Sequence, residues 1–221
     1  MLEIAAGGAV FDRNFYKGSH GDFPDIHQSK MLTIKRSKSE GEEWAGGKWT
    51  PLSETYEMRD GLVCQRNLPD IKPLNYEKSM PMQPLQCVMK NALLRGFEKE
   101  LRPEYGMALP NLEYIGNYRD EETGFLVYAY LGHLHSNTPW SPTRDFKKKI
   151  HPNPEEIDKV GWKTLPQIIE MTKKGKFVNE QFVNTVIQEI ERRVTRDSNS
   201  HSSEYYDGLS RLMQGVPLVT V

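Results

Sequence analysis

The sequence predicts an α/β fold, because segments with the period of strands alternate along the chain with segments with the period of helices. Residues 31–36 alternate between apolar and polar side chains, as a strand with one buried face does. Residues 125–131 form a continuous apolar and aromatic run of strand length between turn signals. Residues 86–101 carry apolar side chains at helical spacing. Elements in this order are typical of a sheet covered by helices.

The first half of the chain predicts two strands and one helix. A strand is expected over residues 2–11, where Gly7 and Gly8 interrupt an apolar run, and another over 31–36. Residues 12–30 are rich in Gly, Asp, Asn, His and Pro and predict a loop. Residues 50–86 are rich in proline, so we expect irregular structure there. The helix over 86–101 follows.

The second half predicts three strands and two helices. The strands are expected over residues 112–118, 125–131 and from 157 to 162. A short helix is expected over 165–173, with Thr164 as its N-cap and Pro166 in its first turn. A longer amphipathic helix is expected over 179–196. We therefore expect one domain over residues 1–196, followed by a polar linker and a short apolar tail over 197–221.

Composition excludes some classes of protein. The net charge of −1 gives no reason to expect bulk attraction to nucleic acid or to an acidic membrane, although local basic patches are compatible with it. No apolar run approaches membrane-spanning length, and the N-terminus lacks the pattern of a signal peptide. Cys64 and Cys87 have no metal-binding or disulfide-framework spacing, so we expect free thiols. A cytoplasmic protein is expected, with the nucleus as the alternative.

The segment 99–107 (KELRPEYGM) is the strongest candidate for a functional site. Glu100 and Glu104 are four residues apart, so on a continuous helix their carboxylates share one face. Two stacked carboxylates can hold a hard divalent cation such as Mg²⁺. Pro103 lies between them and disfavours the helix that would align them. If the helix ends near Leu101, Glu104 leaves the face on which Glu100 lies.

Several segments together resemble the Nudix hydrolase family, whose signature is G-x5-E-x7-R-E-U-x-E-E-x-G-U with U a bulky apolar residue. The pair Gly46 and Gly47 resembles the opening of the signature, and residues 99–107 resemble its closing half. Residues 6–11 and 32–36 resemble the first strands of the family, and residues 155–165 resemble the segment before its last helices. The resemblance covers roughly residues 4–194, with an apparent insertion at about 50–86.

The signature is degenerate here, and two alignments compete. The alignment that ends at Gly106 puts Lys99 in place of the arginine and Pro103 in place of one glutamate. The other alignment matches Arg95 to the arginine, keeps Glu100 as its one carboxylate, and puts Gly96 where a glutamate belongs. We adopt the first as the prediction. Because lysine lacks the rigid fork of arginine, bracing of the site is expected to be weaker.

The resemblance implies an α/β/α sandwich with a mixed sheet and a Mg²⁺-dependent hydrolase that cleaves a diphosphate bond in a nucleoside-diphosphate-linked substrate, with Mn²⁺ as the alternative ion. Metal ligands would be Glu100, Glu104 and the Gly47 carbonyl. Glu100 and Glu156 would be catalytic, with Glu155 as the alternative base. The resemblance places four residues at the substrate: Gly46, Gly47, Trp49 and Arg36.

Other interpretations of the sequence stay open. The chain is alternatively a Nudix-like protein with impaired chemistry that binds a nucleotide or RNA, or that serves as a protein scaffold. Lys147, Lys148 and Lys149 form a basic run that is either a solvated loop or a phosphate contact to substrate or RNA. His133 and His135 share one side of a strand but lack a third ligand of clear spacing. A homodimer is a further possibility.

Overall fold

The computed structural model describes residues 3–12, 29–38, 45–57, 60, 85–105, 107, 109–134 and 146–196. It contains the mixed sheet and flanking helices that the sequence predicts. The bounds of the strands and helices are β1 Ile4–Phe11, β2 Lys30–Arg36, β3 Trp49–Thr50, β4 Leu52–Thr55, α2 Leu85–Leu101, β5 Asn111–Arg119, β6 Leu126–His133, β7 Ile157–Thr164, α4 Leu165–Lys173 and α5 Glu180–Arg196. Among the described residues no helix is long and apolar enough to cross a bilayer.

The seven strands form one mixed sheet, in which β1 is central. β1 pairs in parallel with β6 along its whole length, and β5 continues the sheet beyond β6 as an antiparallel neighbour. On its other side β1 pairs first with β4, over residues 5–8, and then with β2 at Phe11. β2 in turn pairs with β3 and with β7. The sheet therefore divides beside β1 into a β4 branch and a β2 branch.

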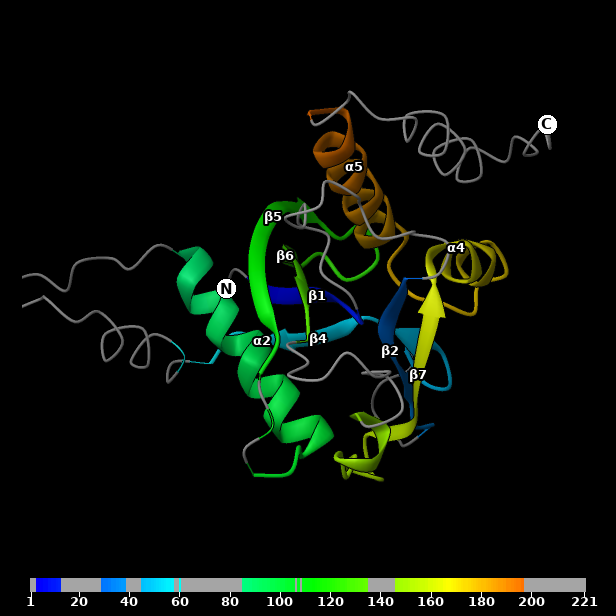
Figure 1. Ribbon diagram of the computed structural model, residues 1–221. Helices are drawn as coiled ribbons and strands as arrows, with labels where there is room; N and C mark the ends of the chain where they lie inside the picture. The colour runs from blue at the N-terminus through cyan, green and yellow to red at the C-terminus, as the bar shows by residue number, and fades with distance from the viewer. Residues whose placement is uncertain are drawn as a thin grey trace, which may run out of the picture.

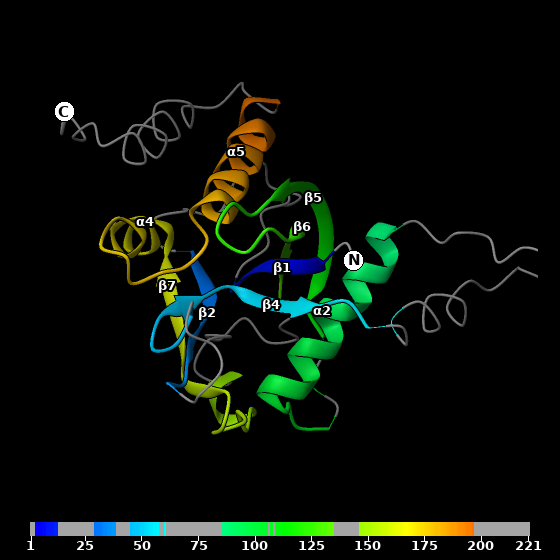
Figure 2. The same ribbon diagram turned by 180° about the vertical axis from the view of Figure 1, so that it is seen from behind.

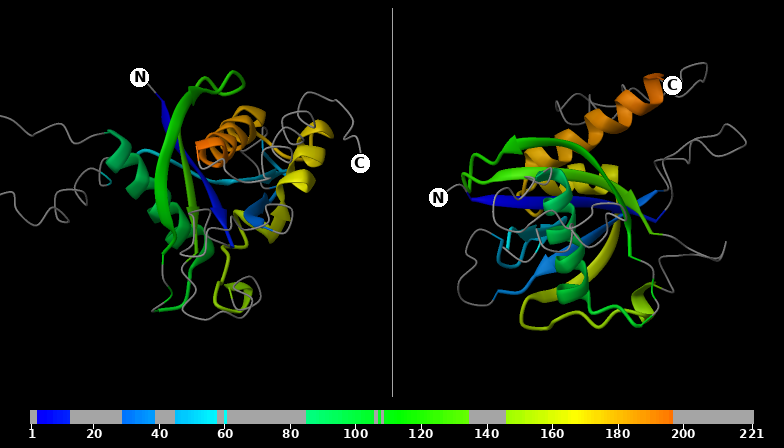
Figure 3. Two further views of the ribbon diagram at one scale, coloured as in Figure 1. Left: turned by 45° about the horizontal axis from the view of Figure 1, so that its top comes forward. Right: turned by 90° about the vertical axis from the view of Figure 1, so that its left-hand side faces the viewer.

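Helices cover both faces of the sheet, so the predicted α/β/α sandwich is confirmed (Figure 1). α2 covers one face and α4 and α5 cover the other, which the view from behind and the turned views also show (Figures 2 and 3). Alternate residues of β1 supply the two cores: Ala9 and Phe11 pack with α4 and α5, whereas Ala6 and Val10 pack with α2. This alternation is the period of a strand buried on both faces.

Glycines in β1 allow the close packing of these layers. A Cβ at Gly8 would lie 2.6 Å from Cδ2 of Leu93 on α2, and a Cβ at Gly7 would lie 2.9 Å from Cε2 of Phe182 on α5. Larger residues at these positions would push a helix away from the sheet. The interruption of the apolar run at residues 7 and 8 is thus a packing feature of the strand.

The structure differs from the prediction in the segment 50–86. Irregular structure is expected there, but Leu52–Thr55 is a strand that pairs with β1. Pro51 is compatible with this pairing because it lies between β3 and β4 and not inside either strand. The sheet therefore continues into the first residues of the expected insertion. Most of the remaining segment, the linker and the tail over 197–221 lie outside the described residues.

Candidate functional site

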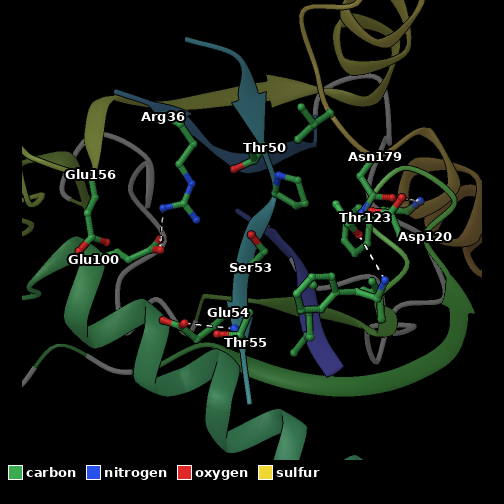
Figure 4. A pocket seen from close by; sticks show the side chains of 18 of the residues that line it. Arg36, Thr50, Ser53, Glu54, Thr55, Glu100, Asp120, Thr123, Glu156 and Asn179 are labelled. Atoms are coloured by element: carbon green, nitrogen blue, oxygen red, sulfur yellow. Dashed lines mark hydrogen bonds and ion pairs between the residues drawn. The ribbon is translucent and has the colours of Figure 1, made fainter. Parts of the chain in front are cut away.

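A pocket of about 420 Å³ lies between the end of α2, the β4 branch of the sheet and the start of α5. Figure 4 shows Arg36, Glu100 and Glu156 at one end, Asp120, Thr123 and Asn179 at the other, and Ser53 between them. The apolar part of the wall comes from strands, connections and the start of α5, and includes Ala5, Ala6, Pro51, Phe125, Val127, Val178 and Phe182. The pocket thus has a charged end and a more apolar end.

A buried ion pair joins Arg36 on β2 to Glu100 on α2. Nη1 of Arg36 donates a hydrogen bond of 2.7 Å to Oε1 of Glu100. The side chains are 9% and 4% exposed, so water screens the pair little. Helical spacing explains the position of Glu100, because it follows Leu93 and Phe97 on the buried face of α2. The charged end of the pocket is therefore built around a carboxylate that a protein cation already holds.

The environment of Glu100 changes its acidity. Burial raises its pKa to about 7, against the lowering effect of Arg36, and the neighbouring carboxylates of Glu54 and Glu156 raise it further. Its second oxygen, Oε2, is buried and accepts no hydrogen bond from the described residues. Glu100 therefore changes charge near neutral pH, and Arg36 loses its ionised partner when the proton binds.

A second ion pair occupies the same end of the pocket. Nζ of Lys99 lies 3.5 Å from Oε1 of Glu156, and both side chains are partly exposed. The same carboxylate accepts a hydrogen bond from Nδ2 of Asn153. Glu156 lines the pocket whereas Glu155 does not, so of the two candidate bases it is Glu156 that lies near Glu100.

Glu54 and Arg95 belong to this region, although the sequence analysis did not select them for the site. Arg95 on α2 contacts three acids, Glu54 at 3.4 Å, Glu57 at 2.7 Å and Asp60 at 2.9 Å. Glu54 lines the pocket, and its Oε2 accepts no hydrogen bond from the described residues. The sequence offered a clue to Glu54: it lies seven residues after Gly47, and in the signature G-x5-E the glutamate lies six residues after the glycine.

Glu104 does not lie beside Glu100. α2 ends at Leu101, so the expected continuous helical face is not present. Pro103 instead forms an isolated bridge with Ile150, and the carboxylate of Glu104 lies 3.8 Å from Nε2 of His151. Glu104 is half exposed and is absent from the wall of the pocket. This placement agrees with the effect of Pro103 on the helix.

The end of α2 favours the second alignment to the Nudix signature. Arg102 has φ +45°, a left-handed conformation that glycine adopts most easily. The second alignment puts the glycine of the signature at Arg102 and its arginine at Arg95. Gly106, which ends the first alignment, lies outside the described residues. In the second alignment Gly96 and Lys99 stand where the signature has glutamates, and only Glu100 keeps a carboxylate.

Gly96 has no room for the missing glutamate. A Cβ there would lie 2.9 Å from the Cβ of Glu54, so α2 and β4 touch at this point. The close contact between α2 and the side chain of Glu54 on β4 depends on the absence of a side chain at Gly96. Glycine at this position is therefore part of how the helix packs on the sheet.

The glycine turn lies beside the site and not in its wall. The N–H of Gly47 donates to the carbonyl of Arg36, and φ of Gly47 is +76°, as expected for glycine in a tight turn. Trp49 packs against the core under α4 and α5, with Nζ of Lys163 5.0 Å from its ring centroid. Of the four residues expected at the substrate, Gly46, Gly47 and Trp49 do not line the pocket, and Arg36 does.

The aromatic and histidine candidates of the sheet lie in the core. Tyr128 and Tyr130 on β6 both pack against Tyr114 on β5, with ring centroids 5.9 Å apart in each pair. His133 is buried at the end of β6, and His135 lies outside the described residues.

The residues present do not fit the metal site that the resemblance implies. Within the described ranges no group of three or more Asp, Glu, His or Cys side chains is arranged to hold a metal ion. Two protein cations, Arg36 and Lys99, lie at the carboxylates of Glu100 and Glu156. A divalent ion at the same carboxylates would compete with both and would be repelled by their charge.

No family model matches the chain, and no curated protein sequence matches it. Solved structures that resemble it include a MutT protein from Methanosarcina mazei Go1, with 14% identity, 87% of this chain and 94% of that chain covered, and a TM-score of 0.45. The Nudix domain of Shewanella oneidensis NrtR, complexed with ADP ribose, has 11% identity, coverage of 88% and 89%, and a TM-score of 0.45. A C. elegans Ap4A hydrolase has 11% identity, coverage of 88% and 99%, and a TM-score of 0.46. These likenesses concern the fold and carry no conclusion about the site.

Proposed function

We propose that this chain is a Nudix-like protein that binds a nucleotide-type ligand in its pocket without metal-dependent hydrolysis. The observation that carries the proposal is the pairing of Arg36 with Glu100 and of Lys99 with Glu156. Hydrolysis of a diphosphate needs carboxylates that are free to hold a cation and to accept a proton from water. Here protein cations neutralise the carboxylates that would do this work.

The two ends of the pocket suit the two ends of a nucleotide. Phosphates would lie near Arg36 and Lys99, and a base or ribose would lie against Phe125 and Phe182, within reach of the polar groups of Asp120 and Asn179. The phosphates must compete with the glutamates for the two cations. We therefore expect moderate affinity that depends on pH.

Protonation of Glu100 should favour the ligand. Because the pKa of Glu100 is raised to about 7, a fall in pH through 7 removes a negative charge and releases Arg36 for a phosphate. Affinity for ADP-ribose should rise as pH falls from 8 to 6. Glu100→Gln mimics the neutral acid, so it should bind more tightly than the parent at pH 8 and show a smaller pH dependence.

Mg²⁺-dependent hydrolysis, or its Mn²⁺ equivalent, is the competing function. The observation in its favour is that Oε2 of Glu100 is buried and accepts no hydrogen bond from the described residues, and that Oε2 of Glu54, likewise buried, has only the ion pair of 3.4 Å with Nη1 of Arg95. Buried carboxylate oxygens without partners are costly, and a bound cation would satisfy them. Ligand binding and product formation must therefore be measured both with and without metal.

Calorimetry and product analysis separate the two functions. Pure protein is titrated with ADP-ribose, dinucleotides, nucleoside triphosphates and capped RNA, with Mg²⁺ and with EDTA, and products are measured by mass spectrometry. The proposal predicts binding that EDTA does not abolish and no product. Turnover that requires Mg²⁺ and is lost in Glu100→Gln would establish the hydrolase instead.

A pocket-filling pair of variants locates the ligand. Ser53→Tyr places a ring inside the pocket and should abolish binding, whereas Lys159→Tyr places the same ring on the exposed side of β7 and should not. If no ligand of the panel binds the parent protein, or if both variants bind equally well, the pocket is not a nucleotide site. A scaffold role would then be the better description.

A further inference from the structure

The structure brings two distant basic segments together at one end of the molecule, away from α4. The end of α2 and residues 146–151 both lie at the lower end in Figure 1. Pro103 bridges Ile150, the N–H of Glu104 donates to the carbonyl of Lys149 at 2.8 Å, and the N–H of His151 donates to the carbonyl of Leu101 at 2.9 Å. These backbone contacts fix the side chains of the two segments on one surface.

Four cations of this surface are solvent-exposed: Arg102, Lys147, Lys148 and Lys149. None of the ion pairs found among the described residues involves any of them, whereas most arginines of the fold are paired. Among the described residues Glu98 and Glu104 are exposed acids at the end of α2 and just after it, and the carboxylate of Glu104 lies 3.8 Å from Nε2 of His151. Since the chain as a whole carries a net charge of −1, this concentration of positive charge is local.

Arg102 holds its position against a conformational cost. Its φ of +45° is in the left-handed region, where a side chain is unfavourable and glycine is preferred. This conformation ends α2 after Leu101, and the N–H of His151 donates to the carbonyls of Leu101 and Arg102. The backbone at the helix end therefore joins residues 146–151, and the side chain of Arg102 is left exposed on the shared surface.

Tyr105 adds an aromatic ring to the same surface. It is fully exposed and lies three residues after Arg102. The other large apolar side chains that are exposed among the described residues, Tyr56 and Leu85, are much less so, at 43% and 37%. An exposed ring beside several free cations is the combination that binds stacked bases and their phosphates.

We propose that Arg102, Tyr105, Lys147, Lys148 and Lys149 form a binding surface for single-stranded nucleic acid, named here the basic surface. The cations contact successive phosphates, and Tyr105 stacks on a base. The ring favours a single strand over a duplex because bases of a single strand are open to stacking. This surface is separate from the pocket, since none of the five residues lines it.

Fluorescence anisotropy of labelled oligonucleotides of about 12 nucleotides tests the proposal, because single-strand sites span roughly 4–16 nucleotides. Oligouridylate and oligothymidylate arms distinguish RNA from DNA, and a duplex serves as comparison. The full-length protein should bind a single strand more tightly than the duplex. The logarithm of the association constant should fall with the logarithm of salt concentration, by a slope of about 0.7 for each phosphate contact.

Matched triple variants separate this surface from general basic charge. Lys147→Ala/Lys148→Ala/Lys149→Ala should weaken binding and reduce the salt slope by about 2. Lys173→Ala/Lys174→Ala/Lys176→Ala removes three exposed lysines near the end of α4 and should change little. Equal loss in both triple variants would show nonspecific attraction and overturn the proposal.

Two single variants test the aromatic ring and the strained arginine. Tyr105→Ala should weaken binding about tenfold without changing the salt slope, because stacking does not release counterions. Arg102→Gly should weaken binding and raise the melting temperature, because glycine adopts the left-handed conformation without strain. Unfolding of the variant would then not account for its weaker binding. Undiminished binding in both variants, or tighter binding to anionic phospholipid vesicles than to any oligonucleotide, would contradict the proposal.

Discussion

At the scale of single residues, Glu100 decides how this site is understood. Its Oε1 accepts a hydrogen bond from Arg36, and its Oε2 accepts none from the part of the chain that the structure describes. The sequence predicted Glu100 as a site residue from its spacing to Glu104 and from the Nudix resemblance, and in the structure Glu100 lines the pocket. It could not reveal the partner, since Arg36 is 64 residues away on β2 and no local pattern joins the two.

The pKa of Glu100 predicts a pH dependence of stability. Since its folded pKa is about 7 and its ordinary value is 4.5, the folded state binds the proton more tightly than the unfolded state. The contribution to stability is complete below pH 4.5 and is lost as pH rises through 7, by on the order of 2 to 3 kcal/mol. Denaturant unfolding at pH 5 and pH 8 should therefore show that Glu100→Gln gains stability relative to the parent as pH rises.

The control for this effect is Glu170→Gln, at an exposed acid on α4 whose pKa is lowered by its contact with Lys174. Its stability relative to the parent should not rise with pH. If Glu100→Gln follows the parent at every pH, the carboxyl is ionised throughout this range.

Lys99 offers a gain-of-function test at the same scale. Lys99→Glu removes the cation that pairs with Glu156 and adds a third carboxylate beside Glu100 and Glu156. Three carboxylates at one end of a pocket can hold a divalent ion. We expect Lys99→Glu to bind Mn²⁺ saturably and Lys99→Gln to bind it weakly or not at all, as measured by electron paramagnetic resonance. Equal behaviour of the two variants would show that Lys99 is not what prevents metal binding.

At the scale of elements, the predictions succeeded where one hydrophobic period runs through the whole element. The helix predicted over 86–101 begins one residue earlier in the structure, and the helix over 165–173 has the predicted bounds. β4 was missed because four residues after a proline carry too little periodicity to be recognised. The left-handed conformation of Arg102 was also missed, since an arginine at the end of a helix gives no sign of it.

Contact between α2 and β4 gives a test of the packing at Gly96. Gly96→Ala places a methyl group 2.9 Å from the Cβ of Glu54, so the helix must shift. Overpacking should outweigh the gain in helix propensity and lower the free energy of unfolding by about 1–2 kcal/mol. Gln86→Ala, at an exposed position of the same helix, should have little effect. Equal stability of Gly96→Ala and the parent would show that the two elements can separate freely.

At the scale of the whole molecule, the pocket depends on the division of the sheet beside β1. The β4 branch, α2, the turn before β6 and the start of α5 each contribute part of its wall. These segments are far apart in the chain, and a sequence pattern without long-range pairing does not bring them together. The prediction placed α2 and α5 in the right order but not β4, and the side chains at the charged end changed what the pocket is expected to do.

We propose that Arg36 and Lys99 take the place of a catalytic metal at Glu100 and Glu156. Titration of the parent protein with Mn²⁺, followed by electron paramagnetic resonance, tests this proposal most directly. Mn²⁺ is a paramagnetic substitute for Mg²⁺ at oxygen ligands. We expect no saturable binding to the parent protein. One saturable site in the parent that is lost in Glu100→Gln would contradict it.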